Sequence, residues 1–230
     1  MHARASIKPL EWENQFFNRH SALLTLDDTQ ALELARLDDF DLVQAKVSAQ
    51  QTAALDWLGQ CGFHLVEGEA DLALPIETTT RQSGIRIARA EHIPALRAVA
   101  AEAFALSRFR APWYPPDASA RFYAQWVENA VQGTFDHQCL LATDQQGRLQ
   151  GFVSLRKLAN DEARIGLLAS VPEARGQGVG ARLVLAAADW CNAHRLTRLR
   201  VATQLSNVAA MRLYLRCGAT LESTAYWLYR

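Results

Sequence analysis

The distribution of hydrophobic and polar positions predicts alternating strands and helices, most clearly after residue 80. Apolar runs bounded by turn residues predict strands at 84–88, 139–143, 149–155, 163–169, 198–203 and 223–228. Apolar residues at helical spacing predict helices at 93–105, after Asp117, at 180–194 and at 207–217. Residues 144–147 predict a hairpin turn, because Gly147 can adopt the positive φ that such turns favour.

A polar segment at 78–83 interrupts this pattern and predicts two units, 1–80 and 81–230. Residues 43–65 can be laid on residues 199–221 without a gap, which pairs Cys61 with Cys217. Each of the two stretches has the pattern of a strand, a helix, a glycine that ends the helix, and a second strand. Two interpretations remain open: the first unit is a half-repeat of the second, or it is an unrelated β-α-β unit with the same pattern.

Composition limits the classes of function. Hydrophobic residues make up 50% of the 230 positions and charged residues 21%, which excludes a disordered or fibrous chain. The 24 basic residues equal the 24 acidic ones, which favours a small partner over nucleic acid or an acidic membrane. The sequence lacks an apolar signal segment and a long apolar run, so a cytoplasmic location is expected. Cysteines and histidines lack paired spacings, so we expect neither disulfides nor a metal.

The most informative segment is a glycine-rich turn between a predicted strand and a predicted helix. Glycines at positions 176, 178 and 180 leave the backbone accessible where the helix begins. Unpaired N–H groups and the positive end of the helix dipole at that place suit a diphosphate, and Arg175 can add a charged contact. Tight packing alone would explain a single glycine-rich turn equally well.

Two motifs together resemble the GNAT superfamily of N-acyltransferases. The sequence from Arg175 to Gly180 matches its R-x-x-G-x-G signature for acyl-CoA. About 30 residues later, a second motif matches as N-x-x-A-x-x-L-Y-x-x-x-G from Asn207 to Gly218. The order of predicted elements after residue 84 also agrees with that fold. The resemblance implies an α+β fold with three α/β/α layers, preceded by a smaller half-GNAT-like unit.

The resemblance further implies acetyl-CoA as co-substrate, without a metal. In this family the strand before the glycine-rich turn separates from its neighbour, and we expect Gly166 to tolerate the associated bulge. Free backbone groups would then hold the cofactor and polarise its carbonyl. The expected cofactor-binding residues are Leu168, Ala169, Ser170, Val171, Arg175, Gly176, Gln177, Gly178, Val179, Gly180 and Asn207.

Tyr214 is implied to be the acid that protonates the departing thiolate, because a phenol stays protonated at neutral pH. Asn207 would also order the site, and a helix N-cap is a compatible role. In a half-repeat, Gln51 and Leu58 occupy the places of Asn207 and Tyr214. The first unit is therefore expected to be catalytically silent.

An amine must lose a proton before it attacks the thioester. The candidate bases are Glu67 and Glu69, with Glu67 preferred because the first unit could then contribute to the acceptor pocket. A solvated pair of glutamates is the alternative.

The segment between the first two helices after residue 90 combines arginines with aromatic rings. Arginines suit phosphates, and flat rings suit a base or sugar, so a nucleotide-linked amino sugar fits as acceptor. The expected acceptor-binding residues are Arg108, Arg110, Tyr114, Arg121 and Tyr123. The alternative for each is a place in the core or in a surface loop.

Two other functions stay open at this point. One is a GNAT that acts on a protein N-terminus, a lysine or a small-molecule amine. The other is a non-catalytic module that binds acyl-CoA, which the presence of Tyr214 disfavours. The sequence leaves the oligomeric state open, including a homodimer.

Overall fold

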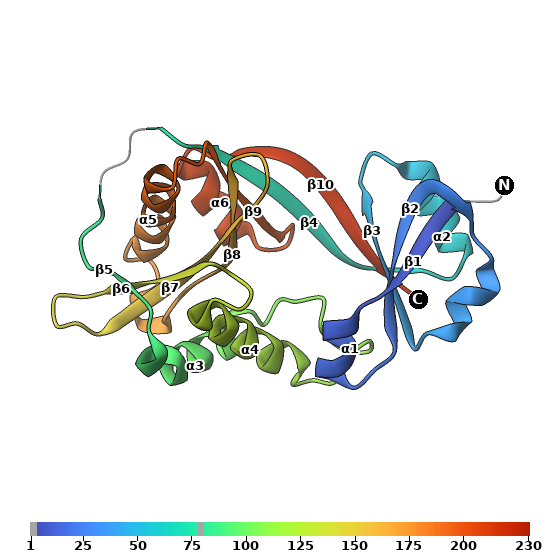
Figure 1. Cartoon of the computed structure of the whole chain (residues 1–230), viewed down its shortest axis with the longest axis horizontal. Coiled ribbons are helices and arrows are strands. Elements are labelled where there is room, and N and C mark those ends of the chain that lie inside the picture. Colours follow the sequence, from blue (N-terminus) through green and yellow to red (C-terminus); the bar gives the residue numbers. More distant parts are fainter. Residues whose placement is uncertain (1–3, 78–80) are drawn as a thin grey trace.

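The computed structural model describes residues 4–77 and 81–230; for residues 28–30 it describes the backbone alone. Part of the predicted linker at 78–83 therefore lies outside the described residues. Within those residues, ten strands form one mixed sheet in the order β1-β2-β3-β10-β4-β9-β8-β7-β6-β5 (Figure 1). The strands are β1 (Arg4–Pro9), β2 (Ser21–Ala31), β3 (Leu42–Ser48), β4 (His64–Pro75), β5 (Ile85–Ile87), β6 (Gln138–Thr143), β7 (Leu149–Lys157), β8 (Glu162–Ser170), β9 (Arg198–Gln204) and β10 (Thr220–Tyr229).

Helices cover the sheet in layers. The α-helices are α1 (Glu11–Phe17), α2 (Thr52–Gln60), α3 (Ile93–Ala103), α4 (Ala118–Gln132), α5 (Val179–Ala193) and α6 (Val208–Arg216). Figure 1 shows α5 and α6 on one side of the sheet and α3 and α4 on the other. Leu183 of α5 and Val127 of α4 are fully buried in the two cores so formed. The mixed sheet with helices on both faces agrees with the three α/β/α layers expected from the resemblance.

Each strand and helix predicted after residue 80 is present, with ends that shift by up to three residues. β6 and β7 pair antiparallel through the predicted turn, where Gly147 has a φ of 79°. Asp117 lies at the N-cap of α4 as predicted. Its side chain, however, makes no cap hydrogen bond and instead forms an ion pair with Arg121 at 2.9 Å.

Three elements recur at a constant distance along the chain. β3 and β9 begin at residues 42 and 198, α2 and α6 at 52 and 208, and β4 and β10 at 64 and 220, each pair 156 residues apart. The strand pairing repeats as well: Ser48 of β3 faces Ala225 of β10, and Gln204 of β9 faces Glu69 of β4. β4, from the early part of the chain, thus pairs with β9 of the later part, and β10 pairs with β3 of the early part. The two strands have exchanged places.

This exchange places a strand from the early part of the chain in the middle of the sheet that carries α5. β4 and β10 also pair with each other and run between the two ends of the molecule in Figure 1. The division into units 1–80 and 81–230 stays a prediction. Over the described residues, none of the helices combines the length and apolar character needed to cross a membrane.

The early and later parts of the chain differ in the segment that connects their two parallel strands, which are β2 and β3 in the early part and β8 and β9 in the later part. α5 connects β8 to β9, whereas only the short 3-10 helix η1 (Leu34–Asp39) lies between β2 and β3. Leu58 stands 156 residues before Tyr214 and is fully buried in a hydrophobic cluster with Ala45 and Phe63. Apolar side chains therefore fill the region that corresponds to the Tyr214 site.

Candidate active site

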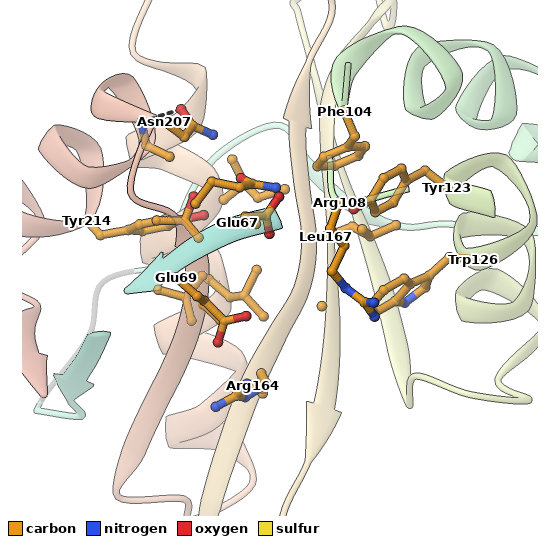
Figure 2. Close-up of a pocket in the computed structure, with 18 of the residues that line it drawn as sticks. Glu67, Glu69, Phe104, Arg108, Tyr123, Trp126, Arg164, Leu167, Asn207 and Tyr214 are labelled. Carbon is orange, nitrogen blue, oxygen red and sulfur yellow. Dashed lines mark hydrogen bonds between the residues drawn. The ribbon is translucent and has the colours of Figure 1, made fainter. Parts of the chain in front are cut away.

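A cavity of about 280 Å³ opens where β8 and β9 separate (Figure 2). Parallel pairing between these strands ends at Ile165 and Val201. Beyond that point, Gly166 to Leu168 and Ala202 to Gln204 line the cavity. The separation implied by the family resemblance is thus present. Backbone groups along it have no neighbouring strand on one side, so they remain available to an extended ligand.

A β-bulge shapes the β8 wall of the cavity. Gly166 and Leu167 together oppose the single residue Ser154 of β7. A Cβ at Gly166 would lie 2.5 Å from Asp136 Oδ2, so only glycine fits there. The bulge also changes the face that each later residue presents: Ile165 packs in the core under α5, whereas Leu167 packs under α3 and α4. The bulge expected at Gly166 is confirmed.

Buried polar groups hold this bulge in place. The Ser154 hydroxyl accepts the backbone N–H of Leu167 at 2.9 Å and donates to Asp136 Oδ2 at 2.6 Å. Trp126 Nε1 donates to the same carboxylate oxygen at 2.9 Å. Asp136 is fully buried, and its other oxygen lies 3.6 Å from Arg156 Nε. The backbone at the cavity wall is therefore fixed from behind.

α6 presents Asn207 and Tyr214 to the cavity, as Figure 2 shows. The Asn207 side chain caps α6 by accepting the N–H of Ala210 at 3.1 Å. Tyr214 is 5% exposed, and none of the described residues hydrogen-bonds to its hydroxyl. Burial, with a smaller effect of Cys217, raises the pKa of Tyr214 above its ordinary value. The phenol therefore keeps its proton at neutral pH.

The N-terminus of α5 lies beside the separated end of β8. Gly176 and Gly178 have φ angles of 75° and 78°, which favour glycine. Gly178 is the N-cap and provides no side-chain cap, so the first N–H groups of α5 have no cap partner among the described residues. Gly180 has a packing role, because a Cβ there would lie 2.9 Å from Leu213 Cδ2 of α6. Arg175 is exposed next to this turn.

β4 brings Glu67 and Glu69 to the cavity, but their surroundings differ. Burial raises the pKa of Glu67 to about 7, although the guanidinium and backbone N–H of Arg108 oppose the shift. Glu69 accepts a hydrogen bond from Trp227 Nε1 at 2.9 Å and is ion-paired with Lys46. Glu67 is thus the carboxylate close to half-protonation at neutral pH.

The expected acceptor-binding residues fall into two groups. Arg108 and Tyr123 line the cavity, whereas Arg110, Tyr114 and Arg121 do not. Tyr114 is buried at 4% exposure, Arg121 is half exposed, and Arg110 Nη2 donates to a backbone carbonyl at 3.1 Å. A role for these three in acceptor binding stays a prediction.

Arg108 connects the loop after α3 with β3, β10 and α1. Its Nη1 donates to Gln44 Oε1 and to Tyr229 Oη, both at 2.5 Å. Its guanidinium carbon lies 4.1 Å from the ring centroid of Trp227, and its Nη2 lies 3.6 Å from Glu13 Oε1. Several donors of this arginine are therefore occupied within the protein.

The residues that line the cavity and that the sequence did not single out include Phe104, Arg156, Arg164, Thr203 and Trp227. Arg156 and Arg164 occupy the polar positions of alternating strands, a pattern that ordinarily indicates a solvent-facing side. Trp227 faces Glu67 across β10 and β4, which no local pattern reveals.

The described residues contain no group of three or more His, Cys, Asp or Glu side chains arranged to hold a metal ion. All four cysteines are free thiols. Two of them, Cys139 and Cys191, are buried, and burial raises the pKa of each to about 12.

Comparisons with known proteins agree with this geometry. The model of the acetyltransferase (GNAT) family matches residues 100–219. A protein named dTDP-fucosamine acetyltransferase from Escherichia coli O6:H1 is 54% identical over 100% of both chains. A streptothricin acetyltransferase from Escherichia coli is 34% identical over 36% of this chain and 47% of its own.

Solved structures show the same fold at low identity. A GCN5-related N-acetyltransferase from Sphaerobacter thermophilus superposes with a TM-score of 0.67 at 17% identity. The match covers 98% of this chain and 76% of the other. Together with the separated strands and the two matched motifs, these comparisons establish that the chain belongs to the GNAT family of acetyltransferases.

Proposed function

We propose that this protein transfers an acetyl group from acetyl-CoA to the 4-amino group of dTDP-4-amino-4,6-dideoxy-D-galactose. The observation that carries this choice of acceptor is the 54% identity to dTDP-fucosamine acetyltransferase over the full length of both chains. The reaction would take place in the cytoplasm and supply an N-acetylated precursor for enterobacterial common antigen biosynthesis.

Acetyl-CoA would bind along the separated end of β8. In this proposal the cofactor diphosphate lies on the backbone amides from Arg175 to Gly180, where glycines and the helix dipole favour an anion. The pantetheine arm would pair with backbone groups from Leu168 to Val171, and Asn207 would contact it from α6. Acetyl-CoA, when bound, supplies the thioester carbonyl that the amine attacks.

Tyr214 is the proposed general acid. As the amine attacks, the C–S bond breaks and the sulfur takes up negative charge. A phenol that burial keeps protonated can give its proton to that sulfur. Its hydroxyl faces the cavity with no protein partner among the described residues, so no hydrogen bond must be broken first.

Glu67 is the proposed general base. An amino-sugar amine is mostly protonated at pH 7, and it must lose a proton to attack. A carboxylate with a pKa of about 7 is well matched to take that proton, directly or through water. Glu69 fits the role less well, because its two carboxylate oxygens already contact Lys46 Nζ and Trp227 Nε1.

The test is a thiol-release assay with acetyl-CoA and dTDP-4-amino-4,6-dideoxy-D-galactose. We expect stoichiometric release of coenzyme A and an N-acetylated sugar nucleotide. A Tyr214→Phe variant should keep its affinity for acetyl-CoA and lose about 100-fold or more in kcat. Failure of the wild-type protein to release thiol with this sugar would refute the proposed acceptor.

A second acceptor class is suggested by the partial match to streptothricin acetyltransferase. The same assay with streptothricin, a lysine peptide and an N-terminal alanine peptide separates the two. A higher kcat/KM for any of these amines than for the sugar nucleotide would favour the second class.

A further inference from the structure

Three arginines stand side by side on neighbouring strands of the sheet. Arg156 of β7 faces Arg164 of β8, and Arg164 faces Arg200 of β9. Their side chains are 27%, 27% and 23% exposed. Arg156 and Arg164 line the cavity, and Figure 2 shows Arg164 on the side of Glu69 away from Asn207. The first two arginines therefore extend the cavity away from the proposed cofactor site.

The three guanidinium groups differ in how many of their donors are used. Arg200 binds Glu162 with two hydrogen bonds, at 2.6 and 3.1 Å. Arg164 donates one hydrogen bond, to Asp71 Oδ2 at 2.5 Å. Arg156 has no hydrogen bond to any described residue, and its buried Nε is paired with Asp136 only at 3.6 Å. The Nη1 and Nη2 groups of Arg156 and most donors of Arg164 therefore make no hydrogen bond within the described residues, and both residues line the cavity.

The position of Arg156 is nevertheless fixed. Its guanidinium lies 4.3 Å from the centroid of Phe135, and Asp136 Oδ1 is 3.6 Å from its Nε. Phe135 in turn packs edge-on against Trp126. An arginine held in this way loses little conformational entropy when it binds a ligand.

The acidic neighbours decide what kind of anion fits. Asp136 and Asp71 balance the charges of Arg156 and Arg164, and Glu67 and Glu69 line the same cavity. A small anion with a single charge gains little electrostatic attraction from arginines whose charges are already balanced by these carboxylates. A ligand with several acceptor oxygens can instead use the free donors of both guanidinium groups, as diphosphates do.

We propose that Arg156 and Arg164 bind the diphosphate of the nucleotide-linked acceptor. This inference rests on the proposed function, because it assigns the acceptor's phosphates to residues of that same cavity. It also explains why Arg108, whose donors reach Gln44 and Tyr229, need not serve the phosphates. The sugar amine would then lie between these arginines and Tyr214, on the side of Glu67.

The test measures binding of dTDP and of thymidine by calorimetry. Saturating coenzyme A is present throughout, so that the N-terminus of α5 is filled. The variants are Arg156→Gln and Arg164→Gln, with Arg198→Gln as matched control. Arg198 is 42% exposed on β9, is paired with Glu222 at 3.5 Å and does not line the cavity.

We expect each cavity variant to weaken dTDP binding by at least about tenfold while thymidine binding changes little. The control should bind dTDP as the wild type does. Unchanged dTDP affinity in both cavity variants, or an equal loss for thymidine, would overturn the proposal. Unchanged coenzyme A affinity in the variants shows that the fold persists.

Calorimetry together with the thiol-release assay on the same variants separates this inference from the proposed function. Arginine-dependent dTDP binding without acetylation of the dTDP-amino sugar would leave the diphosphate site in place and refute the acceptor chemistry. Acetylation with a KM for the sugar nucleotide that neither variant changes would refute the diphosphate site alone.

Discussion

The Ser154 hydroxyl donates a 2.6 Å hydrogen bond to the buried carboxylate of Asp136. The same hydroxyl oxygen accepts the Leu167 N–H of the bulge, so Asp136 acts on the cavity wall through Ser154. Asp136 and Ser154 are thus positioning residues for the backbone that would receive the thioester.

Replacing Ser154 with alanine should change catalysis as well as stability. The Leu167 N–H and Asp136 would each lose a buried partner, which costs about 1–3 kcal/mol of unfolding free energy. The displaced bulge should also lower kcat and raise the KM for acetyl-CoA, measured by steady-state thiol release.

Ser6→Ala is the matched control, because Ser6 donates a 2.6 Å hydrogen bond to Asp27 on β2, outside the cavity. It should lower stability with little change in kcat. Equal kinetic constants for Ser154→Ala and the wild type would contradict the positioning role.

The pH dependence of the reaction should reflect the protonation of the Glu67 carboxylate. Burial raises the pKa of Glu67 to about 7, so the base form is lost as the pH falls through 7. We expect kcat/KM to decline below about pH 7. Glu67→Gln should lower kcat by about 100-fold and abolish this decline, whereas Glu69→Gln should retain it. A decline that persists in Glu67→Gln would assign the base to another group.

Glu67 should also reduce stability at alkaline pH. Its folded-state pKa lies above the ordinary value, so the folded protein binds the proton more tightly, and stability decreases as the pH rises from about 4.5 to 7. Glu67→Gln should therefore raise the unfolding free energy at pH 8, by on the order of 1 kcal/mol after allowance for partial exposure. At pH 4 the difference should vanish. Urea denaturation at the two pH values measures this, and a uniform effect would indicate a packing change instead.

Coenzyme A should bind at one site per chain. The early unit repeats β9, α6 and β10 as β3, α2 and β4, yet Leu58 fills the place of Tyr214 and η1 replaces α5. Parallel pairing of β2 and β3 also ends early, at Leu24 and Ala45, but both residues are buried in the same hydrophobic cluster as Leu58, and among the described residues η1 provides no α-helix N-terminus equivalent to that of α5. Calorimetric titration should give a stoichiometry near one, and a value near two would show a working second site.

Local signals in the sequence were sufficient for the elements after residue 80. Glycines with positive φ, such as Gly147 and Gly178, and apolar periodicity mark turns and helices within a few residues. The motif around Tyr214 also revealed its cavity position, because residues on one helix have fixed spacing.

Contacts between distant segments could not be read in the same way. The exchange of β4 and β10 brings Trp227 opposite Glu67, and no local pattern encodes that pairing. Arg156 and Arg164 resemble ordinary polar positions of a strand until the parallel pairing of β8 and β9 is seen to end one residue after Arg164. Burial of Tyr114 likewise depends on Phe17 and Phe109, which come from separate segments.

The position of the coenzyme A sulfur in a crystal structure of the complex tests the account most directly. With the diphosphate on the first amides of α5, the sulfur should lie within hydrogen-bonding distance of the Tyr214 hydroxyl, about 3.5 Å. A sulfur remote from that phenol, or a diphosphate bound away from the segment from Arg175 to Gly180, would contradict it.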